Sequence, residues 1–303
     1  MIRTKIFYSI KPFIPRIIQL TIRRQIIKRK KAIYADIWPI DLNSSKKPKG
    51  WFGWPNNKKF ALILTHDVET AHGLDKCLQL MNIEKNLGFY SSFNFVPLRY
   101  EVPDDLINTI KNEGFEVGVH GLKHDGKLYK SEKEFKNRAA QINKFLDKWG
   151  AVGFRSPAMH HNLEWIHELH IDYDASTFDT DPFEPQDSGI GTIFPIKIED
   201  PSSKKSYIEL PYTLPQDFTL FVLMREKSID IWKNKLDWIV EHEGMALLNT
   251  HPDYMNFDNE KIGTEEYKSQ LFIEFLEYVK NKYRDKYWLT LPKNLANYSK
   301  KYL

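Results

Sequence analysis

The sequence has little cysteine and no long hydrophobic run, and both scarcities limit what the protein can be. Cys77 is the single cysteine of the chain, so neither an internal disulfide nor a cysteine-based metal site can form. No run reaches the roughly 18 apolar residues that a membrane-spanning helix needs. If the protein binds a metal ion, histidines and carboxylates must therefore hold it.

Glycine is also scarce, with 14 residues in a chain of 303, and low-complexity or collagen-like classes are excluded. Hydrophobic residues make up 42% of the chain and aromatic residues 14%, which is enough for a large core and argues against disorder. The length suits a single α/β barrel.

Acidic residues are absent from residues 1–35, which contain ten Lys and Arg residues. Subtracting the ten positive charges of this arm from the net charge of +4 leaves −6 for the rest. The basic pI of about 8.8 is therefore due to the arm. Isoleucines alternate with the basic residues. Two interpretations stay open: an amphipathic helix lying on an anionic membrane surface or clamping a polyanion, or a helix packed across the barrel with a solvated basic face.

The same segment lacks the uninterrupted apolar core and cleavage site of a secretory signal, because Pro12, Pro15 and Arg16 interrupt it. We therefore expect a cytoplasmic protein, held at the inner membrane face if the arm binds lipid. Nucleic acid is not an expected partner, since no base-reading module follows the arm.

The chain divides into the arm (1–35), a Trp- and Pro-containing linker (36–58) and a body (59–303). In the body, short apolar runs alternate with segments of helical periodicity, which is the pattern of βαβ units around a parallel sheet. The expected strands are 60–64, 93–96, 115–120, 153–154, 171–175, 193–198, 207–210, 245–249 and 288–291. The expected helices are 74–87, 104–112, 132–149, 162–169, 229–243 and a last one from an N-cap at Thr264 to Tyr283. About seven such units predict a barrel.

Polar residues follow several of these strands, where a parallel barrel keeps its active site. Thr65-His66-Asp67-Val68-Glu69 follows the first strand, and His120-Gly121-Leu122-Lys123-His124 follows the third. Phe154-Arg155-Ser156-Pro157 and Asn249-Thr250-His251-Pro252 end two more. Together they bring two carboxylates, three histidines and an arginine to one rim.

The order of these motifs resembles that of the polysaccharide deacetylases, the carbohydrate esterase family 4 built on the NodB homology domain. The resemblance runs from about residue 59 to 291 and takes in five motifs: 65–69, His120 with His124, Arg155 with Pro157, 173–176 and 247–251. It implies a distorted (β/α)7 barrel, here with a basic helical N-terminal arm.

The resemblance also implies roles for individual residues. Asp67 would be the general base, Arg155 would orient it, and His251 would be the general acid. His120 and His124 would bind a divalent metal, with zinc expected and cobalt or nickel as alternatives.

One motif departs from the family pattern. The family's metal-binding aspartate directly after the base is Val68 here, and Glu69 stands at the glycine position. Because alternate strand residues point the same way, Glu69 can share a face with Asp67, and we expect it to be the third metal ligand.

These residue types suit the removal of an N-acetyl group from an amino sugar of a surface polysaccharide or its precursor. A metal with an open position activates water and polarises the carbonyl, and a positioned acid protonates the departing amine. Pro157, Tyr173 and Phe178 are the expected substrate contacts. Two alternatives stay open: hydrolysis of a different amide, such as a cyclic imide or ureide, and an inactive carbohydrate-binding protein, for which Val68 is the main argument.

Overall fold

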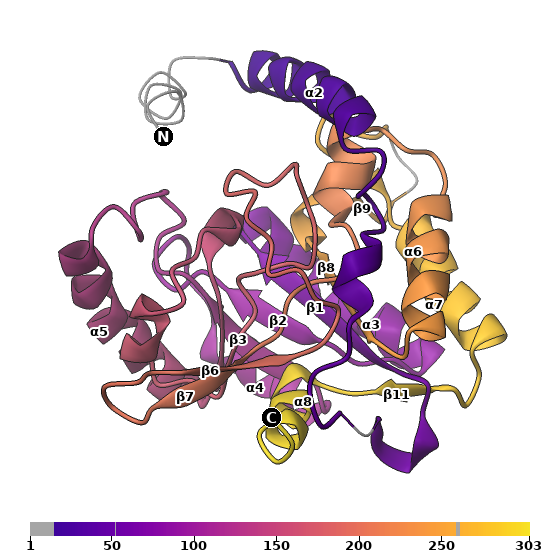
Figure 1. Ribbon diagram of the computed structural model, residues 1–303. Helices are drawn as coiled ribbons and strands as arrows, with labels where there is room; N and C mark the ends of the chain where they lie inside the picture. Colours follow the sequence, from indigo (N-terminus) through magenta and orange to yellow (C-terminus); the bar gives the residue numbers. More distant parts are fainter. Residues whose placement is uncertain (1–14, 52, 259–260) are drawn as a thin grey trace.

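The computed structural model describes residues 15–51, 53–258 and 261–303, and its centre is a curled nine-stranded sheet (Figure 1). The strand order is β11-β1-β2-β3-β4-β5-β7-β6, and β8 also pairs with β1. All neighbours are parallel except β6 and β7. The strands are β1 (Phe60–Val68), β2 (Ser92–Phe95), β3 (Glu116–His120), β4 (Gly153–Arg155), β5 (Tyr173–Asp174), β6 (Ile196–Glu199), β7 (Ser206–Glu209), β8 (Met245–Thr250) and β11 (Tyr287–Leu289).

The sheet curls toward closure because a bridge between Leu214 and Leu248 joins the segment after β7 to β8. Strand β1 is buried along its whole length, as expected of a central parallel strand. The expectation of a distorted (β/α)7 barrel is confirmed.

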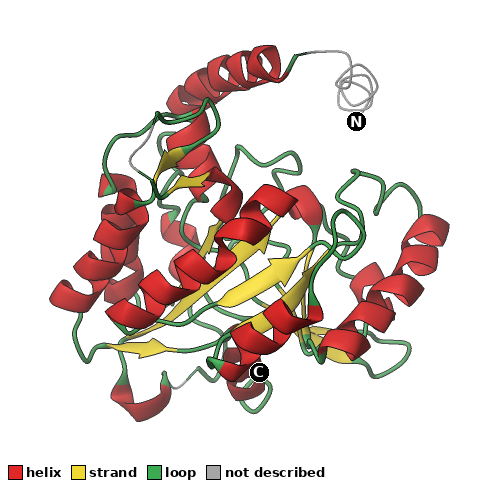
Figure 2. Cartoon of the chain, turned by 180° about the vertical axis from the view of Figure 1, so that it is seen from behind, coloured by secondary structure: helices red, strands yellow, loops and turns green. Residues whose placement is uncertain are grey.

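Helices surround the sheet, as Figure 2 shows from behind. They are α2 (Arg16–Ile33), α3 (Ala71–Leu87), α4 (Asp104–Asn112), α5 (Glu132–Trp149), α6 (Asp230–Glu241), α7 (Gln270–Lys282) and α8 (Pro292–Ser299). Local sequence sets several ends: Thr70 and Ser131 cap α3 and α5, and Gly88 and Gly150 end them in the left-handed conformation. No helix in these described ranges is long and apolar enough to cross a membrane.

The last third of the chain differs most from the expectation. Helix α7 begins at Gln270, not after Thr264, because Tyr267–Lys268 (β10) first pairs with Met255–Asn256 (β9). Helix α8 was not expected, although Pro292 at its first turn is a usual start signal. The expected helix 162–169 is reduced to the 3-10 turn η5 (Trp165–Glu168).

Short turns connect several of these elements. The 3-10 turns are η2 (Leu42–Ser45), η3 (Pro55–Asn57), η4 (Pro157–Met159) and η7 (Pro252–Tyr254), and Phe218–Leu223 (η6) forms a π-helix. The predicted linker wraps onto the body through buried Trp38 and Trp54, whose indole N–H donates to the carbonyl of Glu243. Of the predicted arm, residues 1–14 lie outside the described ranges, and 16–33 form helix α2.

Candidate active site

The polar residues that follow four strands meet at one end of the barrel. Asp67 lies in β1, His120 ends β3, Arg155 ends β4, and His251 directly follows β8. The strand register places these residues at similar heights along the barrel, since His120 pairs with Arg155 and Asp67 pairs with Asn94 of β2. The sequence prediction that these strand ends form one site is consistent with this placement.

Both oxygens of the Asp67 carboxylate accept hydrogen bonds. Asn94 Nδ2 donates to Oδ1 at 2.9 Å, and Asn249 Nδ2 donates to Oδ2 at 2.9 Å. Arg155 Nη1 lies 3.3 Å from Oδ1. Burial alone would raise the pKa of Asp67, but the nearby charges of His120 and Arg155 lower it below its usual range. Asp67 is therefore held as a carboxylate in a fixed orientation.

Arg155 is fully buried and is bonded on several sides. Its Nε donates to the carbonyl of Ala175 at 2.8 Å, and its Nη1 donates to Thr65 Oγ1 and Asn249 Oδ1 at 2.7 and 2.5 Å. The guanidinium thus ties β4 to β1 and β8, as well as facing Asp67. This matches the orienting role expected for Arg155.

Two glycines make room for the site. A Cβ on Gly118 would come within 2.2 Å of Asn94 Oδ1, so the backbone of β3 can approach Asn94 only without a side chain there. Gly121 has a φ of +61°, and a Cβ there would lie 2.5 Å from Pro157. It turns the chain directly after His120, between the two motif histidines.

His120 is arranged as a ligand with a free lone pair. Its Nδ1 donates to the carbonyl of Arg155 at 3.1 Å, which places the ring proton on Nδ1 and the lone pair on Nε2. Nε2 is buried and has no hydrogen-bond partner among the residues that the structure describes. Burial lowers the pKa of His120 to about 4, so the imidazole is neutral near pH 7.

Glu69 faces His124 beside it. His124 Nε2 lies 3.0 Å from Glu69 Oε1, and Glu69 Oε2 accepts from the Tyr254 hydroxyl at 2.9 Å. The backbone N–H of Glu69 donates to Asp253 at 2.9 Å, which fixes the end of β1. Burial alone would raise the pKa of Glu69, but His124 lowers it well below its usual value.

These three side chains fit a metal ion. One ligand atom from each of Glu69, His120 and His124 lies within 4.8 Å of the others. A buried imidazole nitrogen without a partner is costly unless an ion or water uses it, and His120 Nε2 is such an atom. Two imidazoles and one carboxylate are donors that zinc and neighbouring transition metals accept.

His251 is held by a carboxylate that sequence reasoning missed. Asp217, the N-cap of η6, accepts from His251 Nδ1 at 2.7 Å and from the His251 backbone N–H at 2.8 Å. Burial alone would lower the pKa of His251, but Asp217 raises it to about 10. His251 is therefore protonated at neutral pH, with Nε2 left free of Asp217.

Asn94, Gln216 and Asn249 were also missed as site residues. Gln216 Oε1 accepts from Asn249 Nδ2 at 3.0 Å, and Gln216 Nε2 donates to Glu184 at 2.6 Å. A continuous chain of hydrogen bonds thus runs from Asp67 to the loop after β5. Asn249 was visible as a strand-end residue, whereas nothing in the local sequence marked Asn94 or Gln216.

The expected substrate contacts are placed differently. Tyr173 is 2% exposed and its hydroxyl donates to buried Glu116 at 2.8 Å, while the Phe178 ring is fully buried against Tyr212. Pro157 is buried against Gly121. All three side chains are buried, so none presents an exposed face on which a sugar could stack.

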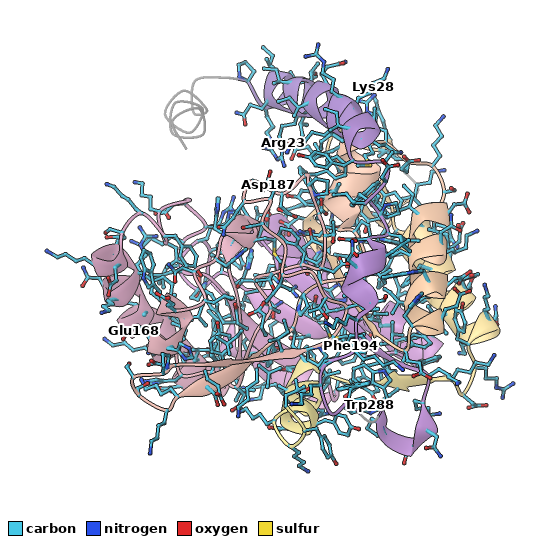
Figure 3. The ribbon with its side chains drawn as sticks, viewed as in Figure 1. Arg23, Lys28, Glu168, Asp187, Phe194 and Trp288 are labelled. Carbon is cyan, nitrogen blue, oxygen red and sulfur yellow. The ribbon has the colours of Figure 1, made fainter. Side chains whose placement is uncertain are left out.

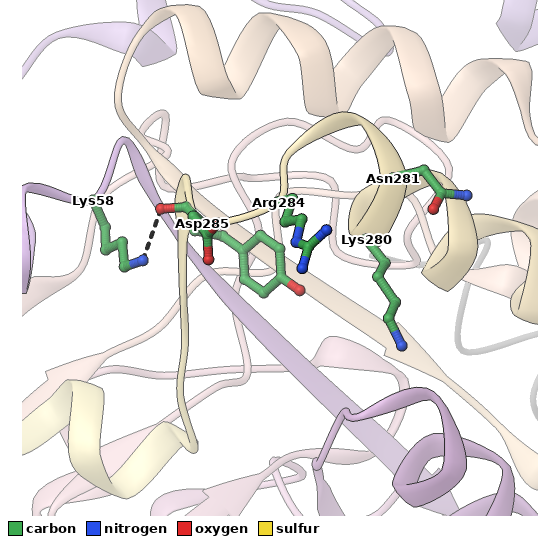
Figure 4. A pocket seen from close by; sticks show the side chains of 6 residues that line it. Lys58, Lys280, Asn281, Arg284 and Asp285 are labelled. Atoms are coloured by element: carbon green, nitrogen blue, oxygen red, sulfur yellow. Dashed lines mark hydrogen bonds between the residues drawn. The ribbon is translucent and has the colours of Figure 1, made fainter.

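A surface pocket lies at the opposite end of the strands (Figure 4). It is lined by Lys58, Lys280, Asn281, Arg284, Asp285 and Tyr287, next to the starts of β1 and β11. Lys58 Nζ donates to the Asp285 carbonyl at 2.7 Å. The barrel separates this pocket from Asp67, so it is not part of the candidate site.

Comparisons with known proteins agree with this architecture. Neither a protein-family model nor a curated protein sequence matches the chain. Among solved structures, a protein described as a polysaccharide deacetylase from Mycobacterium smegmatis superposes with a TM-score of 0.64 at 17% identity, covering 85% of this chain and 96% of that one. A similarly described protein from Pseudomonas aeruginosa gives 0.65 at 15% identity, covering 87% and 98%.

An allantoinase, Puue, superposes almost as well, with a TM-score of 0.63 at 16% identity, covering 86% of this chain and 96% of that one. At these identities the likeness establishes the fold and not the reaction. The chain has the fold of the polysaccharide deacetylases.

Proposed function

We propose that the protein is a metal-dependent hydrolase that removes an N-acetyl group from an amino sugar of a polysaccharide or its precursor. The observation that carries the proposal is the pairing, at one barrel end, of a metal-type triad with an oriented carboxylate and a protonated histidine. Hydrolysis of an unactivated amide needs a proton acceptor for water and a proton donor for the leaving amine.

Glu69, His120 and His124 would hold the metal ion. When bound, a divalent ion supplies Lewis acidity at this position. The chain prepares the ligands in advance: the Arg155 carbonyl fixes the His120 tautomer, and the Tyr254 hydroxyl orients the Glu69 carboxylate. Val68 points away from the triad in this scheme, and Glu69 replaces the aspartate that the family pattern places one residue earlier.

Asp67 would accept the proton of the attacking water. Its carboxylate is ionised and is held by two asparagine amides, so its orientation does not depend on the substrate. The same two amides and Arg155 occupy both of its oxygens, whereas Glu69 Oε1 faces His124. We therefore assign Asp67 to proton transfer and not to metal binding.

His251 would protonate the departing amine. Asp217 occupies Nδ1 and holds the charge, which leaves the Nε2 proton as the one available for transfer. An amine leaves an amide badly without such protonation, and a positioned acid accelerates the step by about 10²–10⁴-fold.

The test is acetate release from N-acetylglucosamine oligomers by the zinc-loaded full-length protein. We expect release by the wild type and by Asp230→Asn, which changes an exposed carboxylate on α6, and a large loss in Asp67→Asn and His251→Ala. No release from any acetylated sugar tested would contradict the proposal.

Allantoin is the matched alternative substrate, because the fold likeness extends to an allantoinase. Ring opening of allantoin without acetate release would favour a ureide hydrolase. Sugar binding that survives Asp67→Asn, with neither reaction, would favour an inactive binding protein.

A further inference from the structure

Helix α2 presents an unusual outer face to solvent. Large apolar side chains that remain exposed in the described residues concentrate there: Ile17, Ile18, Ile22, Ile26 and Ile33 are between 43% and 72% exposed. Ile18, Ile22 and Ile26 recur every fourth residue and thus form one stripe along the helix. Scattered exposed apolar residues need no explanation, but a contiguous stripe marks an interaction surface.

Basic residues accompany the stripe. Lys28 and Arg29 are exposed, and Arg29 stands between Ile26 and Ile33 on the outer side. Figure 3 shows Lys28 on the side of α2 that faces away from the body. Helix α2 contains no acidic residue, so nothing on it neutralises this charge.

The inner side of the helix is firmly attached to the body. Leu20 and Ile27 are buried, Arg24 donates to the carbonyls of Val222 and Thr264, and Lys30 donates to the carbonyl of Pro182 at 2.6 Å. The orientation of the helix is therefore fixed, and the outer face stays outward. Helix α2 is therefore a packed helix on its inner face, and the interpretation as a surface-binding helix stays open for its outer face.

We propose that this outer face, which we call the isoleucine stripe (Ile18, Ile22, Ile26 and Ile33 with Lys28 and Arg29), docks the protein on an anionic lipid bilayer. Apolar side chains would enter the boundary between headgroups and acyl chains, and the basic ones would meet lipid phosphates. Charge decides against a second copy of the chain as the occupant, since two such faces would bring like charges together.

A neighbouring loop that contacts α2 also exposes an isoleucine. Ile262 is 40% exposed, and its loop is fastened to α2 through Thr264 and through Glu265, which pairs with Arg16. Arg225, whose charge acts on Arg24, adds a further exposed cation beside the helix.

The docked protein would hold its active site close to the bilayer. Arg23 of α2 lies over the Phe218 ring at 4.9 Å, Phe218 packs on Tyr254 at 4.7 Å, and Tyr254 donates to Glu69. One helix, about 10 Å across, thus separates the isoleucine stripe from the rim of the site. If the proposed function holds, this arrangement favours a sugar presented at a membrane surface.

The test is flotation of the full-length protein with phosphatidylcholine vesicles, with or without phosphatidylglycerol, at several salt concentrations. We expect binding only with phosphatidylglycerol, weakened by salt. Ile18→Ser/Ile22→Ser and Lys28→Glu/Arg29→Glu should each lower the vesicle affinity roughly tenfold or more, since these residues supply the apolar and the electrostatic attraction.

Matched controls lie on other helices. Leu78→Ser replaces a leucine of α3 that is 44% exposed, and Lys133→Glu/Lys144→Glu reverses two exposed lysines of α5; both should bind as the wild type does. Thermal unfolding of every variant verifies that it is folded. Equal binding to neutral vesicles, unchanged binding by the stripe variants, or a dimer that the isoleucine substitutions dissociate would overturn the proposal. None of these readouts depends on catalytic activity.

Discussion

The candidate site has two halves, one around Asp67 and one around Glu69, and they differ in how fully the protein itself satisfies their polar atoms. Around Asp67, every carboxylate oxygen has a donor, supplied by Asn94, Asn249 and Arg155. Around Glu69, the imidazole Nε2 of His120 is buried without a partner. In the first half the protein alone satisfies both oxygens of Asp67, although Arg155 Nη2 is buried there without a partner among the described residues. In the second half, His120 Nε2 is satisfied only when an ion or a water lies between the ligands. Two carboxylates that stand two residues apart, Asp67 in β1 and Glu69 just after it, can therefore have different roles, and their hydrogen bonds distinguish them.

The largest effect should come from Asp67→Asn. Loss of the base should lower acetate release by about 10²–10⁴-fold while zinc content stays at the wild-type level. Steady-state kinetics with elemental analysis measures both. Parallel loss of zinc and activity would show that Asp67 is a ligand and would remove the distinction between the halves.

Asp217→Asn should shift the pH dependence of the reaction. Burial lowers the pKa of His251 and Asp217 raises it to about 10, so the wild type keeps its acid protonated through the neutral range. Without the carboxylate the pKa should fall, and activity should decline at a pH several units lower than in the wild type. A pH–rate profile, with Asp230→Asn as control, checks this; superimposable profiles would contradict the role of Asp217.

The pair of His251 and Asp217 should also make the stability of the fold depend on pH. Because the folded pKa of His251 lies above its ordinary value of about 6.5, the stabilisation is fully present below about pH 6.5 and is lost as the pH rises through 10. Asp217→Asn should remove this dependence. Urea unfolding of the metal-free protein across that range measures it, and a wild-type stability that rises between these limits would contradict the assignment.

Tyr254→Phe should have a smaller effect that is confined to the metal half. It removes the hydroxyl that orients Glu69, so zinc affinity should fall by roughly 10–100-fold, with activity restored at saturating zinc. Tyr278→Phe, which removes a hydroxyl bonded to Asp237 far from the site, serves as control. A loss of activity that zinc does not restore would place Tyr254 among the reacting groups.

The smallest effect is expected for Tyr173→Phe. Its hydroxyl donates to buried Glu116 in β3, so catalysis should be unchanged and the free energy of unfolding should fall by about 1 kcal/mol. A raised KM would instead support the prediction from the sequence that Tyr173 contacts the substrate.

The barrel could be predicted because its strands are short apolar runs with polar ends, and helices 104–112 and 132–149 coincide with α4 and α5. The motif residues were predictable for the same reason, since parallel strands deliver their last residues to one rim. Asp217 and Asn94 were not, because their partners lie 34 and 27 positions away and only the curl of the sheet brings them together. Exposure is equally a tertiary property: the sequence showed isoleucines in the arm, but not which of them the body covers.

Glu69 is assigned to metal binding and Asp67 to proton transfer, and the metal content of variants tests this assignment most directly. Wild type, Glu69→Gln and Asp67→Asn should be loaded with zinc, freed of excess and analysed side by side. Zinc should be near-stoichiometric in the wild type and in Asp67→Asn, and most of it should be lost in Glu69→Gln. Zinc retained by Glu69→Gln but lost by Asp67→Asn, or absent from the loaded wild type, would contradict the assignment.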